Sequence, residues 1–177
     1  MEDAILYILV VILIGLSAFF SATETAFSSV NRIRLKNYAG EGNKRAVKTL
    51  KIAEDFDRAL SAILIGNNIV NIASASIGTL IFSNLMGDGP AAVTASTVVM
   101  TVVVLIFGEV LPKSLAKENA EKLSLSVTPM LSAVIYILTP FTAMLVGLKK
   151  LVTGWFRTEN KNPSVTEEEL KLSLIHI

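Results

Sequence analysis

The sequence predicts an all-α membrane protein, with three transmembrane helices and additional interfacial or juxtamembrane helices. Hydrophobic residues make up 52% of its 177 residues, and the mean hydropathy of +0.60 is well above that of a typical soluble domain. These apolar residues are gathered into blocks long enough to cross the hydrocarbon core of a bilayer, which takes about 20 residues. The basic residues lie between or beside those blocks.

Three blocks read as spanning helices, at about residues 4–30, 59–86 and 91–111. The first is not a secretory signal, because residues 1–3 are acidic where a signal peptide needs bases and because the apolar stretch is too long. We therefore interpret it as a retained helix. The link at residues 87–90, Gly-Asp-Gly-Pro, has the composition of a turn.

The basic residues predict the orientation, because cytoplasmic loops carry an excess of lysine and arginine. Eight bases lie between the first two blocks: Arg32, Arg34, Lys36, Lys44, Arg45, Lys48, Lys51 and Arg58. Residues 113–122 add three lysines, whereas the turn at 87–90 has no base. We therefore expect a multi-pass protein of the plasma (inner) membrane, with its N-terminus outside and its C-terminus cytoplasmic. Residues 31–51 should themselves be helical and lie near anionic lipid headgroups.

A fourth apolar block, residues 125–148, has basic residues on both flanks. A simple spanning helix cannot keep both flanks in the cytoplasm, whereas a re-entrant or interfacial pair of helices can. Pro129 and Pro140 suit breaks in such a pair. We favour three spans with a juxtamembrane belt at about residues 113–155, and four true spans remain the alternative.

A carboxylate stands near the inner end of the third block, at Glu109. An ionised group costs roughly 2.5–3.5 kcal/mol at the centre of a bilayer and less near its edge. Such a group calls for a partner, and a cation is the obvious one. The competing interpretation is that Glu109 marks the membrane boundary, since Pro112 and Lys113 follow at once.

Polar residues also form a stripe along each of the first two helices. The first stripe, with Glu24 beside it, consists of Ser17, Ser21, Thr25 and Ser28, and the second of Asn67, Asn71, Ser74 and Gly78. Small residues and hydroxyls in membrane helices often serve packing or bond their own backbone, which is the better interpretation of Ser74 and Gly78. Three asparagines within five residues, Asn67, Asn68 and Asn71, are harder to explain in this way.

Ser21, Asn71 and Glu109 come from three different helices and can converge in a bundle. Their hydroxyl, amide and carboxylate oxygens are the ligands that hard cations prefer, and Gly108 would let a ligand approach the backbone closely. The chain has no cysteine, and its one histidine is His176. The ligand set therefore suits Mg²⁺ or Ca²⁺ better than zinc or copper.

Three strings carry a family resemblance: SAFFSATETAFSSV at residues 17–30, IGNNIVNI at 65–72 and FGEVLPKSLA at 107–116. Their content, order and spacing resemble the membrane domain of the CNNM/CorC magnesium transporters. The resemblance covers the chain from the first helix to about Arg157, so residues 1–157 are expected to form that domain. It implies a homodimer with three spans per subunit and a belt of short helices on the cytoplasmic side.

The same resemblance implies a function, namely Mg²⁺ export that is generally regarded as coupled to Na⁺. The family's ion site matches Ser21, Asn71 and Glu109 here, completed by nearby backbone carbonyls. Asn67 and Asn68 either join Asn71 at the ion or support it. Glu24 and Thr25 are candidates for binding Na⁺.

One departure concerns the C-terminal part. Family members normally continue into a pair of CBS domains that bind ATP, whereas this chain ends soon after the acidic run at residues 167–169. Residues 158–177 are thus expected to begin the linker toward CBS domains that this chain lacks, so that nucleotide regulation would not reside in it. A cloning or frameshift remnant is one interpretation of residues 172–177.

Other functions are less well supported. No nucleophile–base pair is visible, so an enzyme is not expected. Nucleic-acid binding is not expected either, because the bases flank membrane spans. A passive divalent-cation channel, or a non-transporting membrane scaffold or sensor, remains an alternative to the transporter.

Overall fold

The computed structural model describes residues 2–155, with side chains described for residues 3–144. These residues form helices joined by short turns, with no strand among them, which confirms the all-helical prediction. The elements are α1 (Glu2–Ser29), α2 (Arg32–Gly40), α3 (Lys44–Glu54), α4 (Phe56–Met86), α5 (Pro90–Val103), a π-helical turn η1 (Val104–Val110), α6 (Leu111–Glu118) and α7 (Ala120–Trp155). The predicted linker and tail at residues 158–177 lie outside the described residues.

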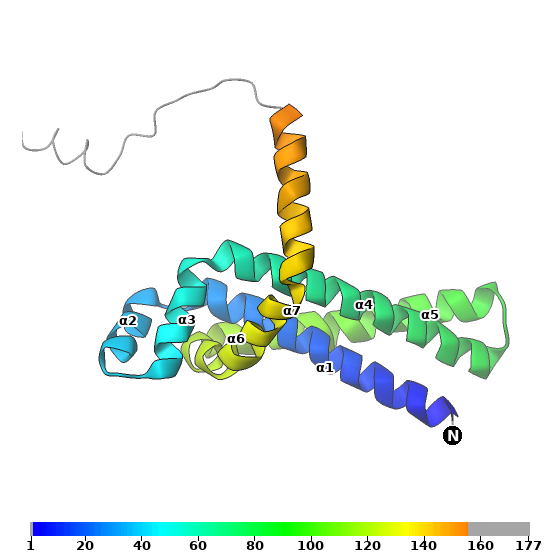
Figure 1. Ribbon diagram of the computed structural model, residues 1–177. Coiled ribbons are helices and arrows are strands. Elements are labelled where there is room, and N and C mark those ends of the chain that lie inside the picture. Colours follow the sequence, from blue (N-terminus) through cyan, green and yellow to red (C-terminus); the bar gives the residue numbers. More distant parts are fainter. Residues whose placement is uncertain (1, 156–177) are drawn as a thin grey trace, which may run out of the picture. The chain divides into compact units, whose positions relative to one another are not determined.

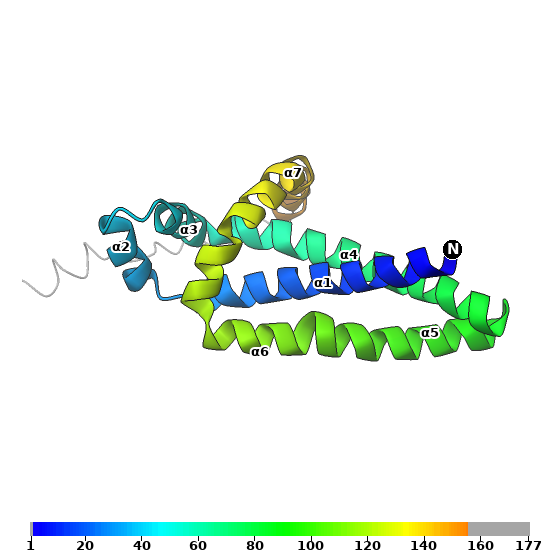
Figure 2. The same ribbon diagram turned by 90° about the horizontal axis from the view of Figure 1, so that it is seen from below.

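Three long elements run side by side: α1, α4, and the continuous rod of α5, η1 and α6 (Figures 1 and 2). α1 packs against both of the others, and small residues let it come close to α4. A Cβ atom at Gly66 of α4 would lie only 2.4 Å from the ring of Phe20 in α1. Phe20, Phe27, Ile63 and Val70 belong to the buried core between these helices. Close packing of this kind is what positions polar groups on three separate helices.

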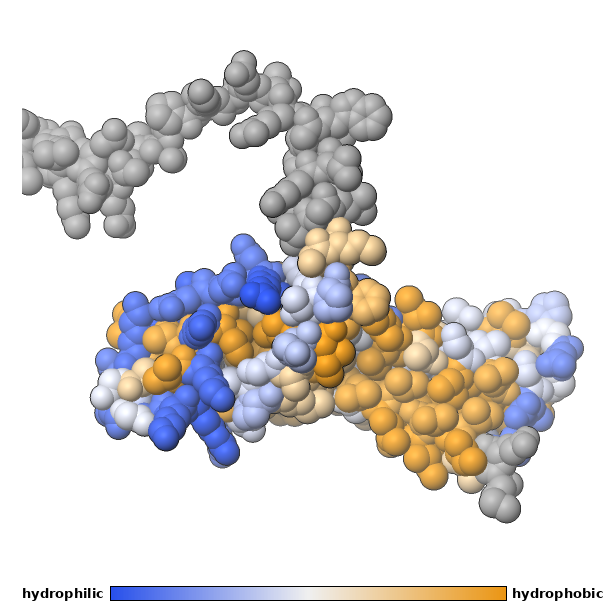
Figure 3. Space-filling view, in the orientation of Figure 1, coloured by the Kyte–Doolittle hydropathy of each residue, from blue (hydrophilic) through white to orange (hydrophobic). Residues whose placement is uncertain are grey.

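The two ends of this bundle differ in chemistry. At one end lie the N-terminus and the α4–α5 turn, where the side-chain amide of Asn84 donates to a carboxylate oxygen of Asp3 at 2.8 Å (Figures 1 and 2). Gly87 has a φ of +80° in this turn, a conformation that favours glycine. At the other end, hydrophilic residues gather over α2 and α3, while hydrophobic residues cover much of α1 (Figure 3). We call the end formed by residues 31–58 and 113–122 the basic end.

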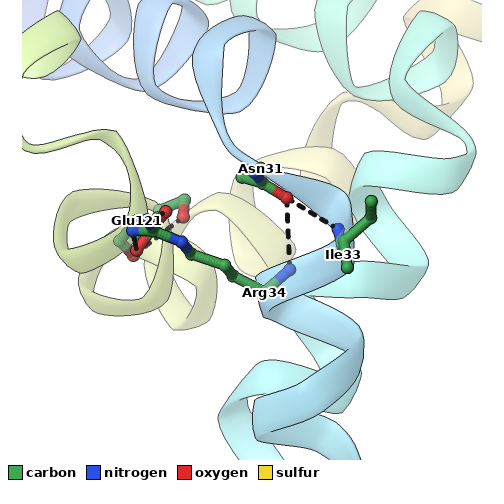
Figure 4. A network of polar contacts seen from close by, with 5 residues as sticks. Asn31, Ile33, Arg34 and Glu121 are labelled. Carbon is green, nitrogen blue, oxygen red and sulfur yellow. Dashed lines mark hydrogen bonds and ion pairs between the residues drawn. The ribbon is translucent and has the colours of Figure 1, made fainter.

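Polar contacts organise the basic end. Asn31 caps α2 by accepting hydrogen bonds from the backbone N–H groups of Ile33 and Arg34, and the Arg34 guanidinium donates to both carboxylate oxygens of Glu121 in α7, at 3.0 and 3.2 Å (Figure 4). The Arg34 side chain is 64% exposed, so this ion pair contributes at most about 1 kcal/mol. The hydroxyls of Thr49 in α3 and Thr128 in α7 form a buried hydrogen bond of 2.7 Å. The connector between α1 and α4 is thus helical, as predicted, and packs against α7.

Large apolar side chains are exposed along the rods, including Val11, Ile72 and Leu85, each at least 66% exposed. Such continuous apolar surface is suited to lipid rather than to water. Four helical stretches are long and apolar enough to cross a membrane, namely Asp3–Ser29, Phe56–Met86, Pro90–Glu118 and Ala120–Met144.

The prediction of helix breaks at Pro129 and Pro140 is wrong. α7 continues through both prolines as one helix. Each follows a threonine whose hydroxyl donates to the carbonyl four residues earlier, Thr128 to Ser124 and Thr139 to Ile135, both at 2.7 Å. Proline removes one backbone hydrogen bond, and such neighbouring hydroxyl bonds help a membrane helix to tolerate that loss.

Candidate ion site

The π-helical turn η1 sets the direction in which Glu109 points. The backbone N–H of Leu111 bonds to the carbonyl of Ile106, five residues earlier instead of four. A π turn therefore carries an extra residue and shifts the helix face that follows it. Because Glu109 is five residues after Val104, one π turn places it on the side of the rod that Val104 occupies. Both residues line the same pocket.

Gly108, the neighbouring residue, is buried against α1. A Cβ atom there would lie 2.8 Å from the Ser17 hydroxyl oxygen and 3.2 Å from the Ser17 Cβ. That hydroxyl donates to the Oδ1 of Asn67 in α4 at 3.2 Å. Ser17, Asn67 and Gly108 thus bring α1, α4 and η1 into contact at one level. What the structure places against Gly108 is a neighbouring helix.

Two of the three predicted principal ligands meet one turn further along α4. The side-chain amide nitrogen of Asn71 donates to Oε1 of Glu109 at 3.4 Å. This contact joins α4 to η1, and it leaves the other amide atom, Oδ1 of Asn71, buried. The amide is therefore oriented by the carboxylate, and its carbonyl oxygen has no hydrogen-bond partner among the side chains and backbone that the structure describes.

The third predicted ligand, Ser21, follows Ser17 by one turn on the same face of α1. Its residue is fully buried, and within the described part of the chain its hydroxyl oxygen finds no hydrogen-bond partner. Oδ1 of Asn71 is also buried without a hydrogen-bond partner in that part of the chain. Among the described residues these are the two buried side-chain nitrogen or oxygen atoms that lack a partner. Leaving a buried polar atom unsatisfied costs about 1–3 kcal/mol, so each calls for an explanation. Both belong to residues that the sequence predicts as cation ligands.

The other predicted site residues lie in different surroundings. Asn67 accepts the hydrogen bond from Ser17, and Asn68 is exposed on α4. Glu24 forms an ion pair with Lys113 of α6, with 3.4 Å between Oε2 and Nζ. Thr25 is partly buried. The structure thus brings Asn71 to Glu109 and places Asn67 one turn away, whereas Asn68 is turned outward.

A pocket of about 290 Å³ lies between α4 and the rod of α5 and η1. Asn71 and Glu109 line one part of it, and its remaining walls combine hydroxyl and apolar side chains: Ala75, Thr79, Ser96, Thr97, Met100, Thr101, Val104 and Leu105. The carboxylate and the amide therefore face a space large enough for several water molecules.

Ser21, Asn71 and Glu109 offer a cation oxygen atoms that carry one negative charge in total. No group of three or more His, Cys, Asp or Glu side chains gathers among the described residues, so a cation here would rely on one carboxylate and on neutral oxygens. Mg²⁺ commonly binds proteins through one or two carboxylates and keeps several of its waters. An amide and a carboxylate beside a pocket that can hold several waters fit that mode of binding.

Sequence reasoning did not identify several residues of this region. Thr97 and Thr101, spaced by four on α5, line the pocket together with Thr79 and Ser96. Their helical spacing was a usable signal, but hydroxyls in membrane helices so often bond their own backbone that the signal is weak. The Glu24–Lys113 ion pair was also unexpected, because Lys113 reads from sequence as an interfacial anchor.

Replacing Gly108 with alanine tests the contact with Ser17. The added Cβ would press on the Ser17 hydroxyl and disturb its hydrogen bond to Asn67, so we expect destabilisation of about 1–3 kcal/mol, as for other overpacked cores. Gly15→Ala is the matched control, because nothing lies within 4 Å of that position. Thermal unfolding in detergent measures both. Equal melting temperatures for the two variants would contradict the close contact.

Fold and site together define a helical, multi-pass membrane protein with a pocket between two of its long helices that a carboxylate, an amide and several hydroxyls line. The chain belongs to the CNNM family: the model of the Cyclin M transmembrane N-terminal domain matches residues 8–175. This membrane family is commonly linked to metal transport.

Relatives come from bacteria and plants. The chain is 34% identical over 164 residues to the UPF0053 inner membrane protein YfjD of Escherichia coli, which covers 91% of the chain and 38% of YfjD. It is 40% identical over 169 residues to a UPF0053 protein of Haemophilus influenzae, covering 94% of the chain and 40% of that protein. A chloroplastic DUF21 domain-containing protein of Arabidopsis thaliana is 34% identical over 171 residues, which are 94% of this chain and 25% of the plant protein. The chain thus spans two fifths or less of the length of these relatives.

Proposed function

We propose that this chain is the transport core of a Na⁺-coupled Mg²⁺ exporter, in which Ser21, Asn71 and Glu109 bind Mg²⁺. The observation that carries the proposal is the contact of Asn71 with Glu109 beside a pocket, together with the two buried oxygens of Ser21 and Asn71 that lack partners among the described residues. In this proposal one cation binds both oxygens and the carboxylate. Membership of the CNNM family supports a metal ion as the cargo. Backbone carbonyls near Gly108 complete the ligand set in this proposal.

We place the protein in the plasma (inner) membrane, with three spans per subunit and the fourth long helix at the cytoplasmic interface. The basic end then faces the cytoplasm, and the N-terminus and the α4–α5 turn face outside. A homodimer is supported by Asn68, an exposed amide within a spanning helix, because an amide facing lipid is unfavourable and a second copy would cover it.

Single cysteines test this topology, since the chain has none of its own. A cysteine at Asp88, in the α4–α5 turn, should react with a membrane-impermeant thiol reagent added to intact cells. A cysteine at Asn43, between α2 and α3, should react only after the membrane is opened. Labelling of position 43 from outside would overturn the orientation.

The Na⁺ coupling is tested in liposomes that contain less Mg²⁺ than the solution outside them. An inward Na⁺ gradient should drive Mg²⁺ efflux against its own gradient, whereas the passive channel would let Mg²⁺ move only down its gradient. A protein that neither binds nor moves Mg²⁺ would instead be a scaffold or sensor. Binding of Mg²⁺ to the purified protein, measured by calorimetry, separates that case from the first two.

A further inference from the structure

The pocket beside Glu109 extends well beyond the proposed ion site. It reaches from Asn71 to Thr79 along α4, eight residues and therefore about 12 Å at the rise of an α-helix. This direction runs toward the α4–α5 turn, away from the basic end. The extension lies in the half of the bundle that a cation must cross after it leaves Glu109 toward the outside.

The walls of this extension carry a row of hydroxyls. On α5 the lining residues follow one helix face, with Thr97 and Thr101 one turn apart, and Val104 and Glu109 continue that face through the π turn. Across the pocket, Thr79 of α4 lies 3.1 Å from the hydroxyl of Ser96. That pair joins the two helices at the end of the pocket away from Glu109.

The hydroxyls of Thr97 and Thr79 present acceptor oxygens to the pocket because their protons are already used. Thr97 donates to the backbone carbonyl of Val93 at 2.8 Å, and Thr79 donates to that of Ala75 at 3.0 Å. A hydroxyl has one donor and two lone pairs, so a hydroxyl bonded in this way faces its surroundings as an acceptor. Neutral oxygen acceptors suit a partly hydrated divalent cation, which they stabilise without holding it as tightly as a carboxylate does.

We propose that this hydroxyl-lined pocket is the outer half of the cation pathway, with Thr97 and Thr101 as the oxygens that receive the ion from Glu109. The inference rests on the proposed function, because it gives the ion's exit route from the same site. It assigns a role in transport to residues outside the proposed ligand set. Water fills the pocket in this account, and the Thr79–Ser96 pair is the constriction that must part for release.

Cysteine accessibility tests the pathway directly. Thr97→Cys and Thr101→Cys, in a chain without other cysteines, are exposed to an impermeant cationic thiosulfonate added outside intact cells. Val98→Cys and Val102→Cys are the controls, since these neighbouring residues are 60% and 50% exposed and do not line the pocket. The threonine positions should react at least ~10-fold faster, because only a hydrated thiol ionises readily to the reactive thiolate. Added Mg²⁺ should slow the reaction at position 101.

A flux measurement completes the test. Thr101→Val removes one pathway oxygen and should lower Mg²⁺ efflux several-fold while Mg²⁺ binding persists. Thr94→Val, on the same helix but outside the pocket, should transport normally.

Three results would overturn the proposed pathway. The first is equal labelling of the threonine positions (97 and 101) and the valine positions (98 and 102), and the second is labelling from the cytoplasmic side alone. The third is equal Mg²⁺ flux through Thr101→Val and Thr94→Val. If the cysteines at positions 97 and 101 are not labelled while Glu109→Gln abolishes transport, the pathway is refuted and the proposed function stands. If those cysteines are labelled while the Glu109→Gln protein still transports Mg²⁺ at the wild-type rate, the proposed function is refuted.

Discussion

Replacing Glu109 with glutamine is expected to abolish Mg²⁺ binding and transport while the protein still folds and dimerises. Glutamine keeps the shape of the side chain and removes the one carboxylate that lines the pocket. Opposite unit charges near 4 Å attract by about 4 kcal/mol at an effective dielectric constant of 20, so a loss of at least ~100-fold in Mg²⁺ affinity is expected. Removing an intramembrane charge also removes its desolvation penalty, so the fold should not lose stability. Calorimetric titration with Mg²⁺ measures the affinity.

Glu41→Gln is the matched control, because Glu41 is exposed in the turn between α2 and α3. It removes the same charge outside the bundle and should bind Mg²⁺ as the wild type does. Size-exclusion chromatography with light scattering reports whether each variant keeps its oligomeric state. A Glu109→Gln protein with wild-type affinity would move the site elsewhere.

Replacing Asn71 with leucine should be the second most damaging change to Mg²⁺ binding. Leucine has a similar size but lacks both the amide that bonds Glu109 and the buried Oδ1. An interaction of a polar group with a charge is worth about 1.5–3 kcal/mol, which corresponds to a loss of roughly 10–100-fold in affinity. Calorimetric titration again provides the measurement, with flux as the second readout.

Asn68→Leu distinguishes between the asparagines. That side chain is exposed and does not line the pocket, so Mg²⁺ affinity should not change even if dimerisation weakens. If Asn68→Leu lost the affinity and Asn71→Leu kept it, the assignment of Asn71 as the ligand would be wrong.

The meeting of Asn71 and Glu109 could be anticipated from sequence. Both are strongly polar residues within long apolar blocks, and such residues in membrane helices face one another or a cavity. The hydroxyl of Ser21, which is buried and has no partner within the described part of the chain, agrees with the same reasoning. The pattern of polar residues within apolar blocks therefore predicts which side chains are buried or in contact with one another inside the bundle.

Other features could not be predicted because they depend on tertiary packing. The π turn at Val104–Val110 has no signal in an apolar run, yet it determines which way Glu109 points. Gly108 was expected to make room for a ligand, and its partner in the structure is Ser17 of another helix. Pro129 was expected to break a helix, but hydroxyl bonding and packing of α7 against α3 favour a continuous one. The tendency of a proline to break a helix is overcome where hydroxyl bonds and a neighbouring helix replace the lost backbone interaction.

We propose that one divalent cation binds between α1, α4 and η1. Anomalous X-ray diffraction from crystals grown with Mn²⁺ in place of Mg²⁺ tests this site most directly, because Mn²⁺ also favours oxygen ligands and gives an anomalous signal. We expect one anomalous peak in each bundle, at roughly 2.0–2.6 Å from Oγ of Ser21, Oδ1 of Asn71 and a carboxylate oxygen of Glu109. A peak elsewhere, with Glu109 facing lipid or bulk solvent, would contradict it.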